Sequence, residues 1–211
     1  MAEGTSDYRQ PRVLTSVLLA LVVFQIFSAA LVGGVVLAAA IRGENLNLPQ
    51  PLFVTYDLIR RTLFVTPLTI TVVKMFWIYR VNKNTHNITS QSMEYTPGWA
   101  VGWHFVPVAS IWYPYFVISE LYRANRNPET WRSDKAPPII LIWWVLTIIS
   151  NIAGTIVSFA TKGGHTEIPL SASAVLLLSL AAHQSMALFI YSRIAGFQKH
   201  TRTIPAIEQV F

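Results

Sequence analysis

Two histidines, His104 and His183, lie inside apolar stretches of the chain, and a pair of histidines is what ligation of haem or another metal would need. Neither has a second histidine or a carboxylate at helical spacing. The sequence contains no cysteine, which excludes disulfides, thiolate catalysis and cysteine-ligated metals or clusters. We therefore expect no cofactor and no metal site, with haem ligation by these histidines as the minor alternative.

The carboxylates give no better indication of catalysis. They are scattered singly through the polar segments and the ends of the apolar stretches, at Glu44, Asp57, Glu94, Glu120, Glu129, Asp134 and Glu167. General acid–base catalysis needs groups held within hydrogen-bond reach of one substrate, and this spacing offers no such pair. The sequence predicts a protein that is not an enzyme and has no catalytic residue.

Polar residues also occur inside the apolar stretches, at Lys74, Asn151, His183 and Gln184. Lys74 precedes Arg80 by six residues, about 9 Å along a helix, so its amine can extend to the headgroups. An internal partner and a role in a transport path are the alternatives for Lys74. For the other three we expect hydrogen bonds between helices.

Composition places these residues in a membrane. The chain has 211 residues, of which 53% are hydrophobic and only 12% charged. The apolar residues form long blocks of the length that a membrane span needs, about 20 residues. The sequence predicts an all-α integral membrane helical bundle that forms a single membrane domain, 1–211, with four transmembrane helices. The expected spans are about 13–41, 62–80, 138–161 and 169–194.

Small residues recur every four positions in two of these spans. Their positions are Ala30, Gly34 and Ala38 in the first span, and Ser150, Gly154 and Ser158 in the third. Small side chains on one face let helix backbones approach closely. We therefore predict that these residues form helix-packing faces.

One apolar stretch does not fit a simple spanning helix. Residues 97–115 read PGWAVGWHFVPVASIWYPY. Pro107 and Pro114 should kink or break a helix here, and a broken backbone is tolerated in lipid only where protein or water satisfies its polar groups. The sequence predicts a re-entrant or interfacial helical segment at 97–118. The aromatic and basic residues expected to contact a partner or lipid are Trp99, Trp103, Trp112, Tyr115, Arg123 and Arg126.

The distribution of lysine and arginine does not separate four spans from five. With four spans and a cytoplasmic amino terminus, eleven basic residues lie inside and four outside; with five spans and an external amino terminus, the numbers are ten and five. We favour four spans because of the prolines and because both flanks of 97–118 are basic. Both termini are then cytoplasmic.

Residues 97–115 resemble the core signature of an uncharacterised bacterial family of multi-pass membrane proteins, a domain of unknown function, with the pattern PGWAVGWxFVPxAxxWxPY. The segments WIYRVNKN at 77–84, ELYRA at 120–124 and the pair Trp143-Trp144 are similar to other parts of that family. His104 and Ser110 depart from the expected pattern, which has an aromatic and an amide residue there. The resemblance implies a bacterial inner (plasma) membrane protein and adds no catalytic residue.

The sequence therefore favours a non-enzymatic integral membrane scaffold or accessory subunit that packs against other membrane protein subunits, or against itself, and against membrane lipids. A small channel or transporter with 97–118 lining a cavity is the main alternative, and a membrane enzyme acting on lipid is a weaker one. The net charge of +6 follows from the basic loops, so we expect no nucleic acid partner.

Overall fold

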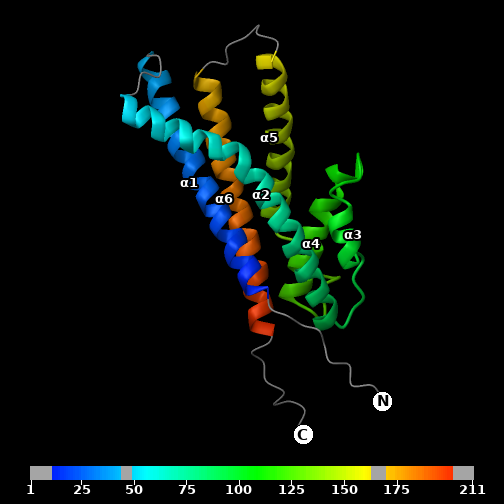
Figure 1. Cartoon of the computed structure of the whole chain (residues 1–211). Helices are drawn as coiled ribbons and strands as arrows, with labels where there is room; N and C mark the ends of the chain where they lie inside the picture. The colour runs from blue at the N-terminus through cyan, green and yellow to red at the C-terminus, as the bar shows by residue number, and fades with distance from the viewer. Residues whose placement is uncertain (1–10, 44–48, 163–169, 202–211) are drawn as a thin grey trace. The chain divides into compact units, whose positions relative to one another are not determined.

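The computed structural model describes residues 11–43, 49–162 and 170–201. Every regular element within these ranges is a helix (Figure 1). In chain order the elements are α1 Arg12–Arg42, α2 Gln50–Ile88, α3 Pro97–Gly102, the 3-10 helix η1 Ala109–Ile111, α4 Tyr113–Arg126, α5 Pro138–Lys162 and α6 Leu170–Thr201. The prediction of an all-helical fold is confirmed for the described residues.

Four of these helices are long and apolar enough to cross a membrane: α1, α2, α5 and α6. The predicted spans 13–41, 138–161 and 169–194 fall within α1, α5 and, from residue 170, α6. The predicted span 62–80 lies within α2, which is longer, runs from Gln50 to Ile88 and carries Pro67 inside it. Its last turns continue beyond the apolar block because their polar side chains, among them Asn84 and Thr85, are buried and hydrogen-bonded.

The chain divides into two compact units, and each of the four long helices passes from one to the other. Unit 1 contains 1–19, 72–141 and 189–211; unit 2 contains 20–71 and 142–188. Unit 1 thus holds the start of α1, the end of α2, the start of α5 and the end of α6. The four helices therefore alternate in direction between the units. The segment from 89 to 137 begins and ends within unit 1.

Unit 2 is held together by apolar side chains from α1, α2 and α6. Its buried centre consists of Ala29, Val32, Val36, Leu63 and Ala174. α1 and α6 pack closely at Gly33, where an added Cβ would lie 3.1 Å from the Cβ of Leu177. A larger side chain at Gly33 would therefore push α1 and α6 apart.

The predicted small-residue faces lie elsewhere. Ala30, Gly34 and Ala38 are exposed on α1, and a Cβ at Gly34 would meet no atom within 4 Å. On α5, Gly154 is likewise exposed and Ser150 is half-buried, while the side chain of Ser158 lies outside the described part of the structure. Close packing inside the chain thus occurs one residue away from the predicted face, at Gly33. A role for Gly34 and Gly154 in association stays a prediction.

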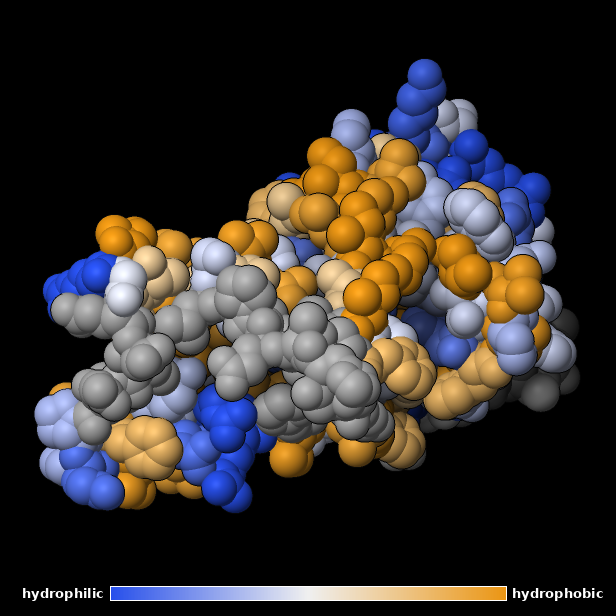
Figure 2. All heavy atoms as spheres, turned by 90° about the horizontal axis from the view of Figure 1, so that it is seen from above, coloured by the Kyte–Doolittle hydropathy of each residue, from blue (hydrophilic) through white to orange (hydrophobic). Residues whose placement is uncertain are grey.

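Many large apolar side chains of the long helices are exposed, and apolar patches are visible on the face seen from above (Figure 2). Phe27 on α1, Leu68 on α2 and Phe159 on α5 are each at least 67% exposed. Large apolar side chains exposed in this number are costly in water and favourable in lipid. The surface therefore agrees with the four helices as membrane spans.

Replacing Gly33 by Leu should destabilise the protein by roughly 1–3 kcal/mol, because the new side chain collides with Leu177 and Leu178. Gly34→Leu is the matched control, since its side chain enters open space within the chain. Thermal unfolding in mild detergent measures both. Equal stability of the two variants would contradict this packing, whereas a normal fold but a smaller complex for Gly34→Leu would reveal association through that face.

Candidate functional site

The segment predicted to be re-entrant is a broken helix within unit 1. α3 begins with Pro97 in its first turn, where the missing N–H costs nothing, and ends at Gly102. The backbone then tightens: His104 N donates to the carbonyl of Val101 over 3.1 Å, and Phe105 N to that of Gly102 over 3.0 Å. The predicted break is confirmed. Pro114 follows it in the first turn of α4, which a proline tolerates.

A tight turn at Val108 completes the break. Its φ is 64° and its ψ −51°, and Ala109 N donates across it to the carbonyl of Pro107 over 2.7 Å. This is the rare γ-turn with positive φ, which is strained for a β-branched residue. Such strain costs about 1–3 kcal/mol and persists only where the surroundings hold the chain in place.

A stack of aromatic rings, which we call the aromatic ladder, helps to hold the chain in place around Val108. Trp99 and Trp103 have ring centroids 4.9 Å apart, as predicted for residues one turn apart, and Trp103 stacks on Tyr113 at 4.1 Å. Tyr95 meets Tyr113 edge-on at 6.1 Å. Each pair contributes about 0.5–1.5 kcal/mol beyond its buried area. The aromatic ladder thus ties α3 to the first turn of α4 across the broken backbone.

Glu120 fastens the connection between α2 and α3 onto α4. Its side chain is buried, and Oε1 accepts a hydrogen bond from Glu94 N over 2.5 Å. Burial raises the pKa of Glu120 to about 7, although the bond from Glu94 and the charge of Arg123 act in the opposite direction. Oε2 has no hydrogen-bond partner among the described residues.

Trp131 is fully buried and lies close to two guanidinium groups. The ring centroid is 5.3 Å from Cζ of Arg123 and 5.4 Å from that of Arg132. Arg132 also donates to the carbonyl of Ser92 over 2.8 Å, which joins the segments on the two sides of α4. Cation–π contacts of this kind contribute about 0.5–2 kcal/mol each.

Arg123 and Arg126, predicted to meet a partner or lipid, are therefore engaged within the chain. Arg123 donates to the carbonyls of Ser119 and Asp134, and Arg126 forms an ion pair with Asp134 at 3.0 Å. The Arg126 guanidinium lowers the pKa of Asp134, so this pair stays charged near neutral pH. Both arginines therefore stabilise the local structure of unit 1.

A buried polar core joins α2, α4 and α6 behind the aromatic ladder. It consists of Asn82, Asn84, Thr85, Asn125 and Gln198, all at most 3% exposed. Asn125 donates to Oγ1 of Thr85 over 2.9 Å, and Nε2 of Gln198 donates to the carbonyl of Val81 over 3.1 Å. Because these hydrogen bonds cross between helices, they fix both α4 and α6 against α2.

Several buried side chains of unit 1 keep a polar atom without a hydrogen-bond partner among the described residues. They are Asn82, Gln91, His104, Ser119, Glu120, Asn125 and Trp131. For Asn82 this holds for both amide atoms. Buried polar atoms are normally satisfied by protein, ordered water or a ligand, so this interior is suited to hold water.

Sequence reasoning anticipated little of this interior. It singled out His104, whose pKa burial lowers to about 4, with a further contribution from the charge of Lys74. It missed Glu120 as a structural group and the whole buried polar core. The run Asn82, Asn84 and Thr85 inside a helix was the available signal, because such residues favour turns unless they find partners.

Two of the other predicted intramembrane residues have hydrogen-bond partners in their own helix. Nδ2 of Asn151 donates to the carbonyl of Thr147 in its own helix over 2.8 Å, and Nδ1 of His183 lies 3.2 Å from the carbonyl of Ser179. Hydrogen bonds between helices through these residues stay a prediction. Gln184 is half-buried on α6. Gln25, which the sequence analysis did not consider, is fully buried on α1.

No three His, Asp or Glu side chains gather as a metal site in the described part of the chain. The remaining aromatic residues of the segment point outward. Trp112 is 61% exposed, and half-buried Tyr115 lies against Phe116 with centroids 5.3 Å apart. The geometry offers a braced aromatic surface and no constellation of reacting groups among the residues described.

The chain belongs to the family "Domain of unknown function (DUF4328)", which matches residues 55–195. This range is wider than the resemblance seen in the sequence and takes in α3, α4, α5 and most of α2 and α6. The search of curated proteins found no match. The search of solved structures found none either.

The shifted pKa of Glu120 predicts a stability that depends on pH. A carboxyl whose folded pKa of about 7 exceeds its unfolded pKa of about 4.5 stabilises the fold in its protonated form. This contribution is complete below pH 4.5 and disappears as the pH rises through 7, a loss of roughly 2 kcal/mol. Unfolding in detergent at pH 5 to 8 should show the loss in the natural chain and not in Glu120→Gln.

The control is Glu129→Gln, which removes an exposed carboxylate from the same unit and should follow the natural chain. A Glu120→Gln variant with the same pH dependence as the natural chain would show that this carboxyl is not buried as described.

Proposed function

We propose that this member of the DUF4328 family is a non-enzymatic membrane scaffold or accessory subunit, which contacts a partner membrane protein and lipid through its aromatic segment. The observation that carries the proposal is an exposed surface that we call the outward apolar face. It consists of Trp99, Phe105, Val108, Ile111, Trp112 and Phe116, all at least 42% exposed.

The outward apolar face has the properties of a recognition surface. Phe105 and Trp112 present large rigid side chains, which bind with little loss of conformational entropy. The aromatic ladder and buried Val117 and Ile118 brace the same segment from behind. A braced apolar surface costs less to order on binding than a mobile one, which favours association.

The topology that we propose has four spans with segment 97–118 re-entrant or interfacial. Its support is that 89–137 begins and ends in unit 1. Ten of the fourteen lysines and arginines in the described ranges also belong to unit 1. By the positive-inside rule, unit 1 and both termini are then cytoplasmic, in a bacterial inner membrane.

A small channel or transporter is the second candidate. Gln25 is fully buried on α1, and neither of its amide atoms has a partner among the described residues. Ser28 and His183 are buried in the same unit. Gly33 on α1 lies beside Leu178 on α6. Ser28 and His183 are each five residues from this position on the two antiparallel helices, so they lie at a similar height along the helix pair. Buried polar groups in a membrane interior often belong to a substrate path.

The absence of cysteine from the sequence allows a direct test of the topology. Single cysteines at Asn87 and Ser133, both exposed, should react from the cytoplasmic side with a membrane-impermeant maleimide. A cysteine at Gln50, at the start of α2, should react from the opposite side. Labelling of Asn87 and Ser133 from opposite sides would establish a third crossing and five spans.

The proposed function predicts that the outward apolar face holds a complex together. Phe105→Ala with Trp112→Ala should reduce the amount of partner that copurifies in mild detergent by tenfold or more, since buried aromatic contacts at an interface contribute about 2 kcal/mol or more. The stability of the subunit itself should hardly change, because both side chains are exposed. Mass spectrometry identifies the partner and light scattering measures the size of the complex.

The matched control replaces Phe27 and Phe159, which are equally exposed aromatic residues in unit 2. It should leave the complex intact. A natural chain that purifies alone, without a second membrane protein, would contradict the scaffold and favour the channel or transporter.

A further inference from the structure

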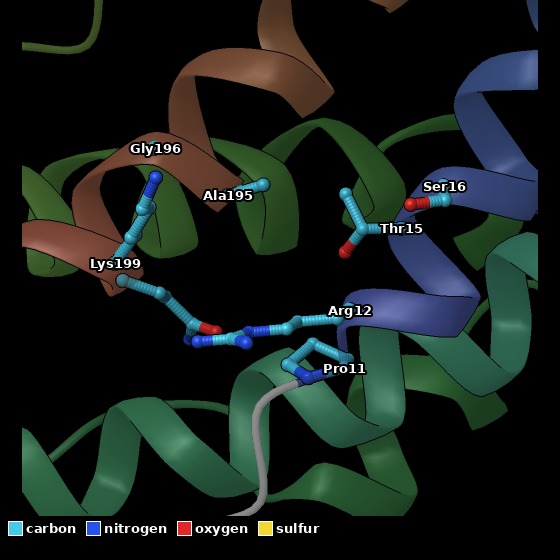
Figure 3. Close-up of a pocket in the computed structure, with 8 residues that line it drawn as sticks. Pro11, Arg12, Thr15, Ser16, Ala195, Gly196 and Lys199 are labelled. Atoms are coloured by element: carbon cyan, nitrogen blue, oxygen red, sulfur yellow. The ribbon is translucent and has the colours of Figure 1, made fainter.

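Three of the long helices each bury one polar residue near the middle of their length. These residues are Gln25 on α1, Thr66 on α2 and His183 on α6, all in unit 2 and all at most 7% exposed. None of them lines the pocket of unit 1 that Figure 3 shows. A polar side chain in the apolar centre of a membrane bundle costs free energy unless it finds a hydrogen-bond partner. The three positions therefore need an explanation of their own.

The three polar residues lie at a similar height along their helices. The buried centre of unit 2 contains Ala29 from α1 and Leu63 from α2, and Leu180 of α6 packs against it. Gln25 precedes Ala29 by four positions on α1. On α2 and α6 the polar residue follows Leu63 and Leu180, respectively, by three positions. Because α1 runs opposite to α2 and α6, all three steps lead about one helical turn in the same direction from that centre.

Gln25 has the strongest need for a partner. It is fully buried, and neither atom of its amide has a hydrogen-bond partner among the described residues. Buried amides in proteins are normally paired with protein, with ordered water or with a ligand, because an unpaired one loses its hydration and gains nothing in return. Its Nε2 donates and its Oε1 accepts, so this side chain suits a molecule that can do both.

The other two residues offer acceptors. Oγ1 of Thr66 donates its hydrogen to the carbonyl of Thr62 over 2.7 Å, which leaves its lone pairs to accept. Nδ1 of His183 lies 3.2 Å from the carbonyl of Ser179, and it must carry the hydrogen, since a carbonyl only accepts. In the neutral ring Nε2 is then an acceptor. The three side chains together offer two acceptors and one amide that both donates and accepts.

Pro67 makes the same height of α2 more polar. A proline has no N–H, so it cannot donate to the carbonyl of Leu63, four residues before it. A helix carbonyl that loses its donor inside a membrane needs another one. A hydrogen-bond donor bound beside Thr66 would also be within one turn of this carbonyl.

The sequence around these residues favours an uncharged molecule. Residues 13–41, 62–73 and 170–192 contain no lysine, arginine, aspartate or glutamate. An ion bound here would have no countercharge on these stretches, and its transfer from water would cost far more than that of a neutral molecule. The smallest neutral molecule that both donates and accepts hydrogen bonds is water, and a buried water commonly has about three polar partners.

We propose that Gln25, Thr66 and His183 form a binding site for an ordered water molecule in the membrane interior of unit 2. The water accepts a hydrogen bond from Nε2 of Gln25 and donates to Oγ1 of Thr66 and Nε2 of His183. It thereby gives α1, α2 and α6 a common hydrogen-bond partner. The inference does not depend on the proposed function, which rests on the outward apolar face of unit 1.

The sign of a stability change tests this site in mild detergent. Gln25→Met keeps the length of the side chain and removes the amide. If the amide holds water, this change removes one of its partners, and the equilibrium constant of unfolding should rise about tenfold. Stability equal to or above that of the natural chain would mean that the amide was simply unpaired, and it overturns the proposal. Gln184→Met is the matched control, because Gln184 is half-buried, and it should stay within about twofold.

Radiolysis with X-rays gives a second readout, because it produces hydroxyl radicals from water held next to a side chain. In the natural chain His183, although only 5% exposed, should be oxidised within about threefold of half-buried His86. Gln25→Met should lower the oxidation of His183 about fivefold and leave His86 unchanged. A larger difference in the natural chain, or no decrease in the variant, overturns the proposal. If Gln25→Met does not fold, the comparison within the natural chain decides.

Discussion

A backbone in apolar surroundings must satisfy its own hydrogen bonds, and the rest of this structure depends on how the broken segment meets that requirement. Between Gly102 and Tyr113 many backbone N–H groups do so by short-range bonds, such as Ser110 N to the carbonyl of Val106 over 2.9 Å. Because the backbone is satisfied locally, the side chains need not cover it. Phe105 and Trp112 are therefore left to face outward, and the segment combines irregular backbone with an apolar surface.

The strained turn at Val108 needs stabilising contacts besides its local hydrogen bonds. The strain costs about 1–3 kcal/mol. Trp103 makes two ring contacts and Trp131 makes two cation–π contacts. Each contact stabilises the fold by about 0.5–2 kcal/mol, and together they exceed the cost of the strain. Glu120 adds a tie from α4 to the preceding segment at Glu94. Unit 1 thus buries Glu120 and several amides beside its apolar core, while the outward apolar face stays exposed.

Sequence patterns predicted the features that depend on composition, namely the long helices and the break. They missed the features that depend on contacts between residues far apart in the chain. Long apolar blocks located α1, α5 and α6, and the prolines located the break. The end of α2 was missed because Asn84 and Thr85 read as a polar loop until Gln198 and Asn125, far along the chain, supply their partners. Gly34 was chosen over Gly33 because α1 is apolar on every side, so its sequence does not indicate which face meets α6.

The same hydrogen bonds connect two features that the sequence presents as unrelated. Gln198 on α6 bonds to α2, while Asn125 bonds α2 to α4 through Thr85. α4 in turn carries Tyr113, the last ring of the aromatic ladder. The buried amides therefore link the last turns of α6 to α4 through the end of α2, and α4 is the helix that braces the outward apolar face.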